Sequence, residues 1–179
     1  MSVSLVIGNI FALLSVIFIF ISVVKKNKTD LIGWQIANIS FCIFSNIALF
    51  AYSALATNCV ALLRNMLAYR KKLTLKATVI LSIACVIAGL YVNNRGIFGW
   101  TVIAGTTSYT IFMYLAKNAQ QMRYALIFSS ILWIVHDFYV QSYPTVISGC
   151  FLIAWTIIQI LKYRKLHFHH KYKVFLKKA

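Results

Sequence analysis

Acidic residues are almost missing from this chain, which has no glutamate and only two aspartates, Asp30 and Asp137, against 18 lysines and arginines. Charged residues make up 11% of the sequence, whereas a soluble domain carries about 25%. So little charge cannot cover a water-facing surface, which excludes a soluble globular domain. It also argues against an enzyme, because acid–base or metal chemistry would depend on His136 and Asp137 without a third group to orient them.

Proline is also scarce, and no two cysteines are spaced as a CxxC motif. The one proline, Pro144, stands at a predicted helix start, where its missing N–H costs nothing. The four cysteines form no CxxC pair and fall in apolar segments, which is typical of small buried thiols. No HExxH motif and no glycine-rich phosphate loop is present. We therefore expect no catalytic residue, no metal site in the apolar segments and no cofactor. The cysteines are Cys42, Cys59, Cys85 and Cys150.

Apolar runs dominate what the sequence does contain. Hydrophobic residues make up 61% of the chain and the mean hydropathy is +0.82. The runs recur with lengths near the roughly 20 residues that cross a bilayer. The sequence thus predicts an all-α integral membrane protein with seven transmembrane helices, the first of which resembles a membrane span more than a cleaved signal peptide. The helices are expected at about residues 3–24, 32–53, 55–69, 73–92, 97–116, 122–140 and 144–163.

The basic residues indicate how these helices are oriented. With seven spans, all of the 18 lysines and arginines except Arg64 and Arg95 fall on one side, after the first, third, fifth and seventh helices. The positive-inside rule then puts the N-terminus outside and the C-terminus in the cytoplasm. Because the basic residues flank apolar runs, they indicate topology and not nucleic-acid binding. Arg64 lies within the third helix, from which it could snorkel toward the interface near Arg70.

Weak internal similarity suggests a duplication of three helices. Lys26-Asn27 and Lys117-Asn118 end the first and fifth helices, and Tyr69-Arg70-Lys71 and Tyr163-Arg164-Lys165 end the third and seventh. The predicted plan is therefore two parallel three-helix bundles joined by a linker helix. Its parts are residues 1–71, the linker 72–96, residues 97–165 and a basic cytoplasmic tail at 166–179. This three-one-three plan resembles SWEET and PQ-loop transporters, although the proline–glutamine signature and proline hinges of that group are absent.

A closer resemblance lies in the segments LLRNMLAYRKK (62–72) and ILWIVHDFYVQSYPTVISGCFLIAWTIIQILKYRK (131–165). They resemble the bacterial inner-membrane family typified by YgjV, which has a Trp-x-x-His-Asn/Asp pattern in its sixth helix. Trp133, His136 and Asp137 match that pattern, and Arg70 and Arg164 match its basic helix ends. The resemblance implies a multi-pass protein of the bacterial inner membrane, suspected to be a transporter, and names no substrate.

Polar side chains in the sixth helix form the candidate substrate-binding site. An ionisable residue in a membrane helix usually faces the bundle interior or water. Ser129, Trp133, His136 and Asp137 lie on one broad face of this helix. The presumed repeat, shifted by 91 residues, brings Ser45 and Asn46 of the second helix to the same depth as His136 and Asp137, and Asn58 of the third helix adds to the lining. The plain alternative is that His136 bonds a neighbouring helix and Asp137 anchors the outer interface.

Two functions remain after these exclusions. The first is a small-solute transporter with a polar cavity between the bundles, working by SWEET-like alternating access, with proton coupling through His136 and Asp137 as a further hypothesis. The second is a non-transporting accessory protein of the inner membrane. The expected partners are a small polar solute and the lipid bilayer, and the chain works either alone or as a homodimer. The tail is expected to lie against anionic lipid, while metal binding by its His167, His169 and His170 is the alternative.

Overall fold

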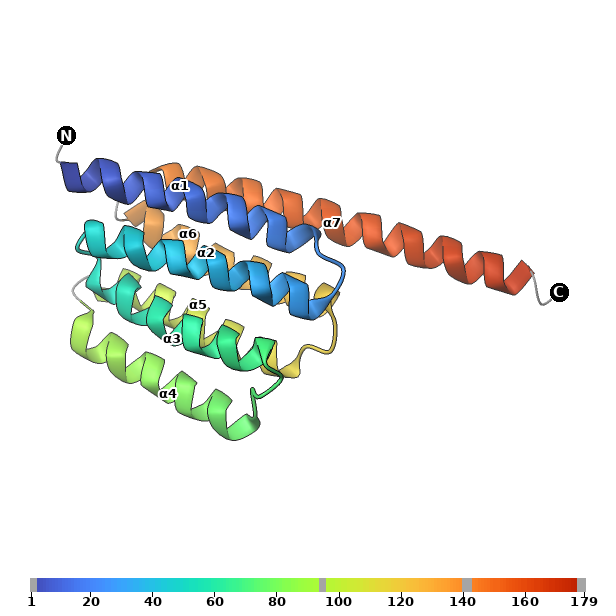
Figure 1. The fold of residues 1–179 in the computed structure, drawn as a ribbon, viewed down its shortest axis with the longest axis horizontal. Coiled ribbons are helices and arrows are strands. Elements are labelled where there is room, and N and C mark those ends of the chain that lie inside the picture. The colour runs from blue at the N-terminus through green and yellow to red at the C-terminus, as the bar shows by residue number, and fades with distance from the viewer. Residues whose placement is uncertain (1–2, 94–95, 140–142, 177–179) are drawn as a thin grey trace.

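The computed structural model describes residues 3–93, 96–139 and 143–176, and of residues 143, 144 and 164–176 it describes the backbone alone. Within these ranges the chain forms seven helices and no strand (Figure 1), as the all-helical prediction requires. Two helices, the second and the seventh, differ most from their predicted ranges. The helices are α1 (Val3–Val24), α2 (Lys28–Ala48), α3 (Tyr52–Tyr69), α4 (Leu75–Val92), α5 (Gly96–Leu115), α6 (Ala119–Tyr139) and α7 (Tyr143–Leu176).

The beginning of α2 lies earlier than the sequence predicts. The prediction of 32–53 leaves Asp30 in a loop, whereas Asp30 occupies the first turn of the helix. A carboxylate is favourable there because the helix N-terminus carries a partial positive charge. The side chain also accepts a hydrogen bond from Nδ2 of Asn27, the residue that precedes the helix, at 3.2 Å.

The end of α2 also differs, because a turn breaks what reads as one apolar run. Phe50 adopts a positive φ of 52°, and the N–H of Ala51 donates to the carbonyl of Asn46 at 3.0 Å. This pairing is a Schellman motif, which usually places glycine at the position that Phe50 occupies. Since an aromatic residue stands there instead, the sequence carries no visible stop signal. The prediction consequently extends the second helix about five residues too far.

Helix α7 is much longer than predicted. The sequence predicts an end near residue 163 followed by a tail, whereas the backbone stays helical to Leu176. No glycine or proline follows Gly149, so nothing in the sequence interrupts the helix near residue 163. Figure 1 shows α7 running beside α1 and projecting past the end of the bundle.

The helices pack in chain order, and three further contacts bring distant segments together. Each helix packs against the next, from α1 to α7. In addition α1 packs against α7, α3 against α5, and α2 against α6. Helix α4 packs against its neighbours α3 and α5, at the side of the bundle (Figure 1). The bundle interior is therefore formed by the remaining helices.

Arg123 joins the start of α6 to the end of α1. The sequence assigns this arginine to a loop as a topology signal, but its side chain is 0% exposed. Its Nε donates to the carbonyl of Val23 at 2.9 Å and its Nη2 to that of Lys25 at 2.8 Å. These carbonyls lie at the C-terminal end of α1, where a helix has unsatisfied acceptors and attracts cations. The guanidinium also lies 4.8 Å from the ring centroid of Tyr163, which links α7 to the same residue.

The outer surface of the bundle is apolar. Large side chains such as Ile80, Leu90 and Phe151 are more than half exposed, as expected of surfaces that contact lipid. Cys59 and Cys150 are exposed as well, and only Cys85 is fully buried, so the expectation of four buried thiols is wrong. Lipid is as apolar as a protein core, and small apolar side chains therefore need no burial in a membrane.

Among the residues that the structure describes, four helices meet the length and hydropathy expected of a segment that crosses a bilayer. They are α1, α2, α4 and the Thr145–Tyr163 part of α7. The three others, α3, α5 and α6, fall short of that measure and contain the largest share of the buried polar side chains. Polar residues that face other helices lower the average hydropathy of a helix without being exposed to lipid.

Candidate functional site

A cavity of about 230 Å³ lies where six of the helices meet, every helix except α4 contributing to its wall. Polar side chains come from both halves of the chain and alternate with aliphatic ones such as Ile19, Ile39 and Leu152. The cavity thus combines an apolar wall with a few polar groups, which is the usual make-up of a site for a small molecule. The polar lining residues are Gln35, Asn38, Asn58, Arg64, Thr106, Tyr109, Ser129, Ser130, Trp133, Asp137, Thr145 and Ser148.

Four of the residues singled out from the sequence line this cavity. Asn58 faces it from α3, and Ser129, Trp133 and Asp137 face it from α6. The Ser129 hydroxyl donates to the carbonyl of Gly105 at 3.1 Å, which holds α6 close to α5. Positions 129, 133 and 137 are four residues apart, so the cavity follows one face of α6 for two helical turns, about 12 Å.

Ser45 and Asn46 do not contribute to the cavity lining. The Ser45 side chain is 5% exposed and donates to the carbonyl of Gly8 in α1 at 2.8 Å. Gly8 allows this close approach, because a Cβ there would lie 2.6 Å from Cγ of Leu49. The last residue of α2 to line the cavity is Cys42, which precedes Ser45 by about one helical turn.

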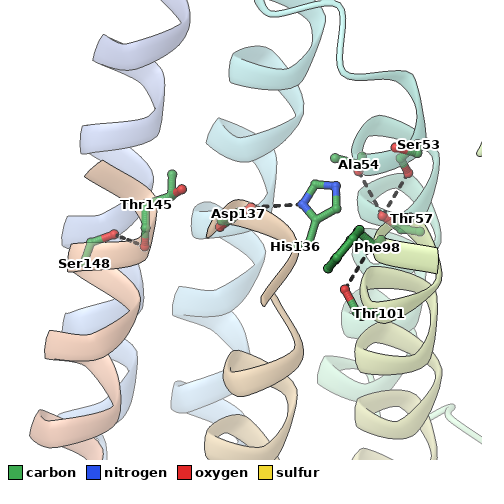
Figure 2. A network of polar contacts seen from close by, with 9 residues as sticks. All are labelled: Ser53, Ala54, Thr57, Phe98, Thr101, His136, Asp137, Thr145 and Ser148. Carbon is green, nitrogen blue, oxygen red and sulfur yellow. Dashed lines mark hydrogen bonds and ion pairs between the residues drawn. The ribbon is translucent and has the colours of Figure 1, made fainter. Parts of the chain in front are cut away.

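His136 and Asp137 point in different directions from α6. Figure 2 shows the Asp137 carboxylate on the side of Thr145 and the His136 ring on the side of α3 and α5. Consecutive helical residues are about 100° apart, so only Asp137 reaches the cavity. His136 is 7% exposed, and its Nδ1 lies 3.1 Å from Oδ1 of Asp137. The imidazole therefore supports the carboxylate from behind and packs edge-on against Trp133, with ring centroids 6.3 Å apart.

The residue that sequence reasoning missed is Arg64. The sequence predicts a side chain that snorkels to the interface, but Arg64 is 3% exposed and lines the cavity. Its Nε donates to Oδ1 of Asn65 at 2.9 Å, and its Nη1 lies 3.3 Å from Oγ1 of Thr110 and 3.5 Å from the carbonyl of Thr106. The guanidinium stacks 4.8 Å from the ring centroid of Tyr109. The available signal was an arginine next to an asparagine in the middle of an apolar run.

Gln35 and Asn38 are two further polar residues that the sequence did not single out. Gln35 and Tyr109 exchange two hydrogen bonds, of 2.7 and 3.1 Å, and so join α2 to α5 across the bundle. Asn38 donates to the carbonyl of Ser15 in α1 at 2.8 Å. Both side chains line the cavity and are fixed by these bonds, so the polar groups of its wall are held in place before any ligand binds.

Charges are few inside the bundle. Arg64 is the one cation and Asp137 the one carboxylate among the lining residues, and they stand at different depths of the cavity. In the described part of the chain the one ion pair is that of Asp137 with His136. Burying a charge without a counter-ion costs several kcal/mol even after relaxation. Arg64 is therefore an energetically costly residue to place in this cavity.

Metal binding has no candidate among the described residues, which contain no group of three histidines, cysteines or acidic residues. The tail histidines His167, His169 and His170 lie outside the side chains that the structure describes.

Comparison with known proteins gives one match. A protein-family model, Imp-YgjV, described as a bacterial inner membrane protein, matches residues 6–167, nearly the whole chain. The matched range includes every residue that lines the cavity. No curated protein and no solved structure matches the chain.

Proposed function

The chain belongs to the YgjV family of bacterial inner membrane proteins, and we propose that it is a small-solute transporter that binds its solute in the central cavity. The observation that supports this function is the contrast between the two surfaces. The outside of the bundle is apolar, whereas twelve polar side chains line a cavity at its centre. Polar groups in a membrane helix are costly, and they usually mark the path of a solute or ion.

The cavity also suggests the size and shape of the solute. At about 230 Å³ it is smaller than the roughly 300–1,000 Å³ typical of drug-sized ligands. Trp133 and Tyr109 supply two aromatic surfaces, and Asn58 and Ser130 supply hydrogen-bonding groups. These features favour a small, flat, polar molecule.

Seven spans and two parallel bundles form the proposed membrane arrangement, with the N-terminus outside. Support comes from the pairing of the helices. If α1, α2 and α3 correspond to α5, α6 and α7, the α1–α7 contact and the α5–α3 contact are two copies of one interface, and α2 meets α6 at the axis between them. Parallel-repeat carriers bind their solute at such an axis and rock one bundle against the other. SWEET-like alternating access is therefore the mechanism we propose.

Proton coupling is a finer hypothesis about the same cavity. The His136–Asp137 pair suggests this hypothesis. Histidine side chains change charge between about pH 5 and 8, and the Asp137 carboxylate that contacts His136 lines the cavity. Uptake that responds equally to a proton gradient in the wild type and in a double variant, His136→Ala with Asp137→Asn, would rule it out.

The transporter proposal is tested by thermal unfolding of the purified protein against sugars, vitamins, nucleosides and amino acids, followed by uptake of any hit into proteoliposomes. A ligand at 100 times its Kd adds about 2.7 kcal/mol to the folded state. We expect at least one hit that Trp133→Ala weakens tenfold or more.

The matched control is Ser45→Ala, which removes a buried hydroxyl of α2 that lies outside the cavity. It is expected to cost only about 0.6 kcal/mol of stability, because hydrogen bonds between membrane helices are weak, and to leave the hit unchanged. Hits that neither variant affects would place the solute outside this cavity, and a lack of both hits and uptake would instead favour the accessory protein.

A further inference from the structure

Arg64 has no counter-ion among the residues that the structure describes. Glutamate is absent, and the two aspartates are Asp30 and Asp137. Asp30 lies in the first turn of α2, bonded to Asn27, at the end of the bundle that carries the basic residues. Asp137 pairs with His136 two helical turns beyond Ser129. Since Arg64 reaches Thr106 and Thr110, at the depth of Ser129 or beyond it, neither carboxylate neutralises the guanidinium.

One nitrogen of the Arg64 guanidinium, Nη2, is also unused. Its hydrogen bonds engage Nε and, at the longer distances of 3.3 and 3.5 Å, Nη1, while Nη2 donates to no acceptor within the part of the chain that the structure describes. Tyr109 stacks on the guanidinium and is itself fixed by Gln35, so the plane of the fork is held in position. Beside it, Nδ2 of Asn65 is buried without an acceptor. Donors are thus in excess around this cation, and what is missing is an acceptor.

The second buried arginine shows what a structural role looks like in the same bundle. Arg123 directs two nitrogens at main-chain carbonyls at the C-terminal end of α1, at 2.8 and 2.9 Å, and a third bond goes to Oε1 of Gln120 at 3.1 Å. Arg64 has a single main-chain acceptor, at the long distance of 3.5 Å. Arg123 is neutralised by the negative end of a helix, whereas Arg64 faces the cavity with its charge uncompensated.

We propose that the solute carries one carboxylate, which pairs with the free Nη2 of Arg64 and the weakly bonded Nη1 beside it. The inference rests on the proposed transport function and names its substrate class. A planar guanidinium binds a planar carboxylate through parallel hydrogen bonds, a geometry that a lysine cannot supply. A single cation balances a single negative charge, and Asp137 at the other end of the cavity repels a second one. The solute is accordingly a small monocarboxylate whose remaining part contacts Trp133 and the aliphatic wall.

Matched acid and amide pairs test this inference in thermal unfolding of the full-length protein. Suitable probes are benzoate with benzamide, nicotinate with nicotinamide, and butyrate with butyramide, together with chloride and phosphate at equal ionic strength. The acid of at least one pair is expected to stabilise the wild type more than its amide. Arg64→Gln should weaken its apparent affinity at least tenfold, and Arg64→Lys should weaken it less because the charge remains. Arg123→Lys, a buried arginine outside the cavity, serves as the control and should retain the preference for the acid.

The alternative outcomes separate this inference from the function on which it rests. Equal stabilisation by acids and amides, or an acid preference that survives in Arg64→Gln, overturns the carboxylate while leaving a solute site in place. If chloride or phosphate stabilises the protein as much as the acids do, Arg64 binds an inorganic anion, and the proposal of a carboxylate solute is overturned as well. If no acid in the panel has an effect, a small monocarboxylate is excluded. Should Arg64→Gln fail to fold, Arg64→Lys decides, because a preference undiminished in that variant rules out recognition by the guanidinium fork.

Discussion

Replacing Arg123 with glutamine is expected to lower the free energy of unfolding by about 3 kcal/mol. The side chain is fully buried and connects three helices through its bonds to Val23 and Lys25 and its contact with Tyr163. Hydrogen bonds from a charged group contribute about 1.5–3 kcal/mol each, and breaking a buried charged contact costs about 3–5 kcal/mol. Glutamine keeps part of the length but loses the charge and the fork, so the carbonyls at the end of α1 lose their donors.

This change in the free energy of unfolding is measured by titrating the protein in a mild detergent with a denaturing detergent and following tryptophan fluorescence. Lys76→Gln is the matched control, because it removes the same charge from an exposed position in α4. Exposed substitutions of this kind change stability by about 0.5 kcal/mol or less. If the two variants lose the same amount of stability, Arg123 is a topology signal alone and not a structural clamp.

Filling the cavity is expected to abolish solute binding while the bundle stays folded. Ala61 lies on α3, is buried and lines the cavity between Asn58 and Arg64. In Ala61→Trp an indole occupies space that the solute needs, at a packing cost of about 1–3 kcal/mol. A hit from the metabolite panel should lose its stabilising effect, and uptake into proteoliposomes should fall to background.

Ala54→Trp provides the comparison for this variant. Ala54 is buried in the same helix, about two turns from Ala61, but does not line the cavity. The Ala54→Trp variant should lose as much stability as Ala61→Trp and should still be stabilised by the solute. Uptake that survives in Ala61→Trp, or is lost to the same extent in both variants, would place the solute path elsewhere.

The helical composition and family of the chain follow from its sequence because both depend on residue types and their order. Apolar runs near the thickness of a bilayer predict helices, and the Trp133, His136 and Asp137 pattern leads to the family that the comparison confirms. Helix ends were harder to predict. The stop after α2 is made by Phe50 in a left-handed conformation, which sequence patterns associate with glycine.

The candidate site could be predicted only in part, because helix phase decides which polar residues face inward. His136 and Asp137 are adjacent in the sequence, yet only Asp137 lines the cavity. Arg64 and Arg123 read as interface charges, since basic residues usually flank membrane spans, and their burial depends on acceptors supplied by helices far away in the sequence. Such long-range contacts leave no local pattern.

Water access to Cys42 tests the central claim, a solvated cavity in the bundle, most directly. Cys42 lines the cavity, whereas Cys59 and Cys150 lie on the outer apolar surface. We would prepare three variants that keep only one of these thiols each, with the other cysteines changed to alanine, and treat them in membranes with a small hydrophilic thiol reagent. The account predicts that Cys42 reacts, that Cys59 and Cys150 do not because lipid covers them, and that Ala61→Trp protects Cys42. A Cys42 that stays inert in the folded protein and reacts only after denaturation would contradict it.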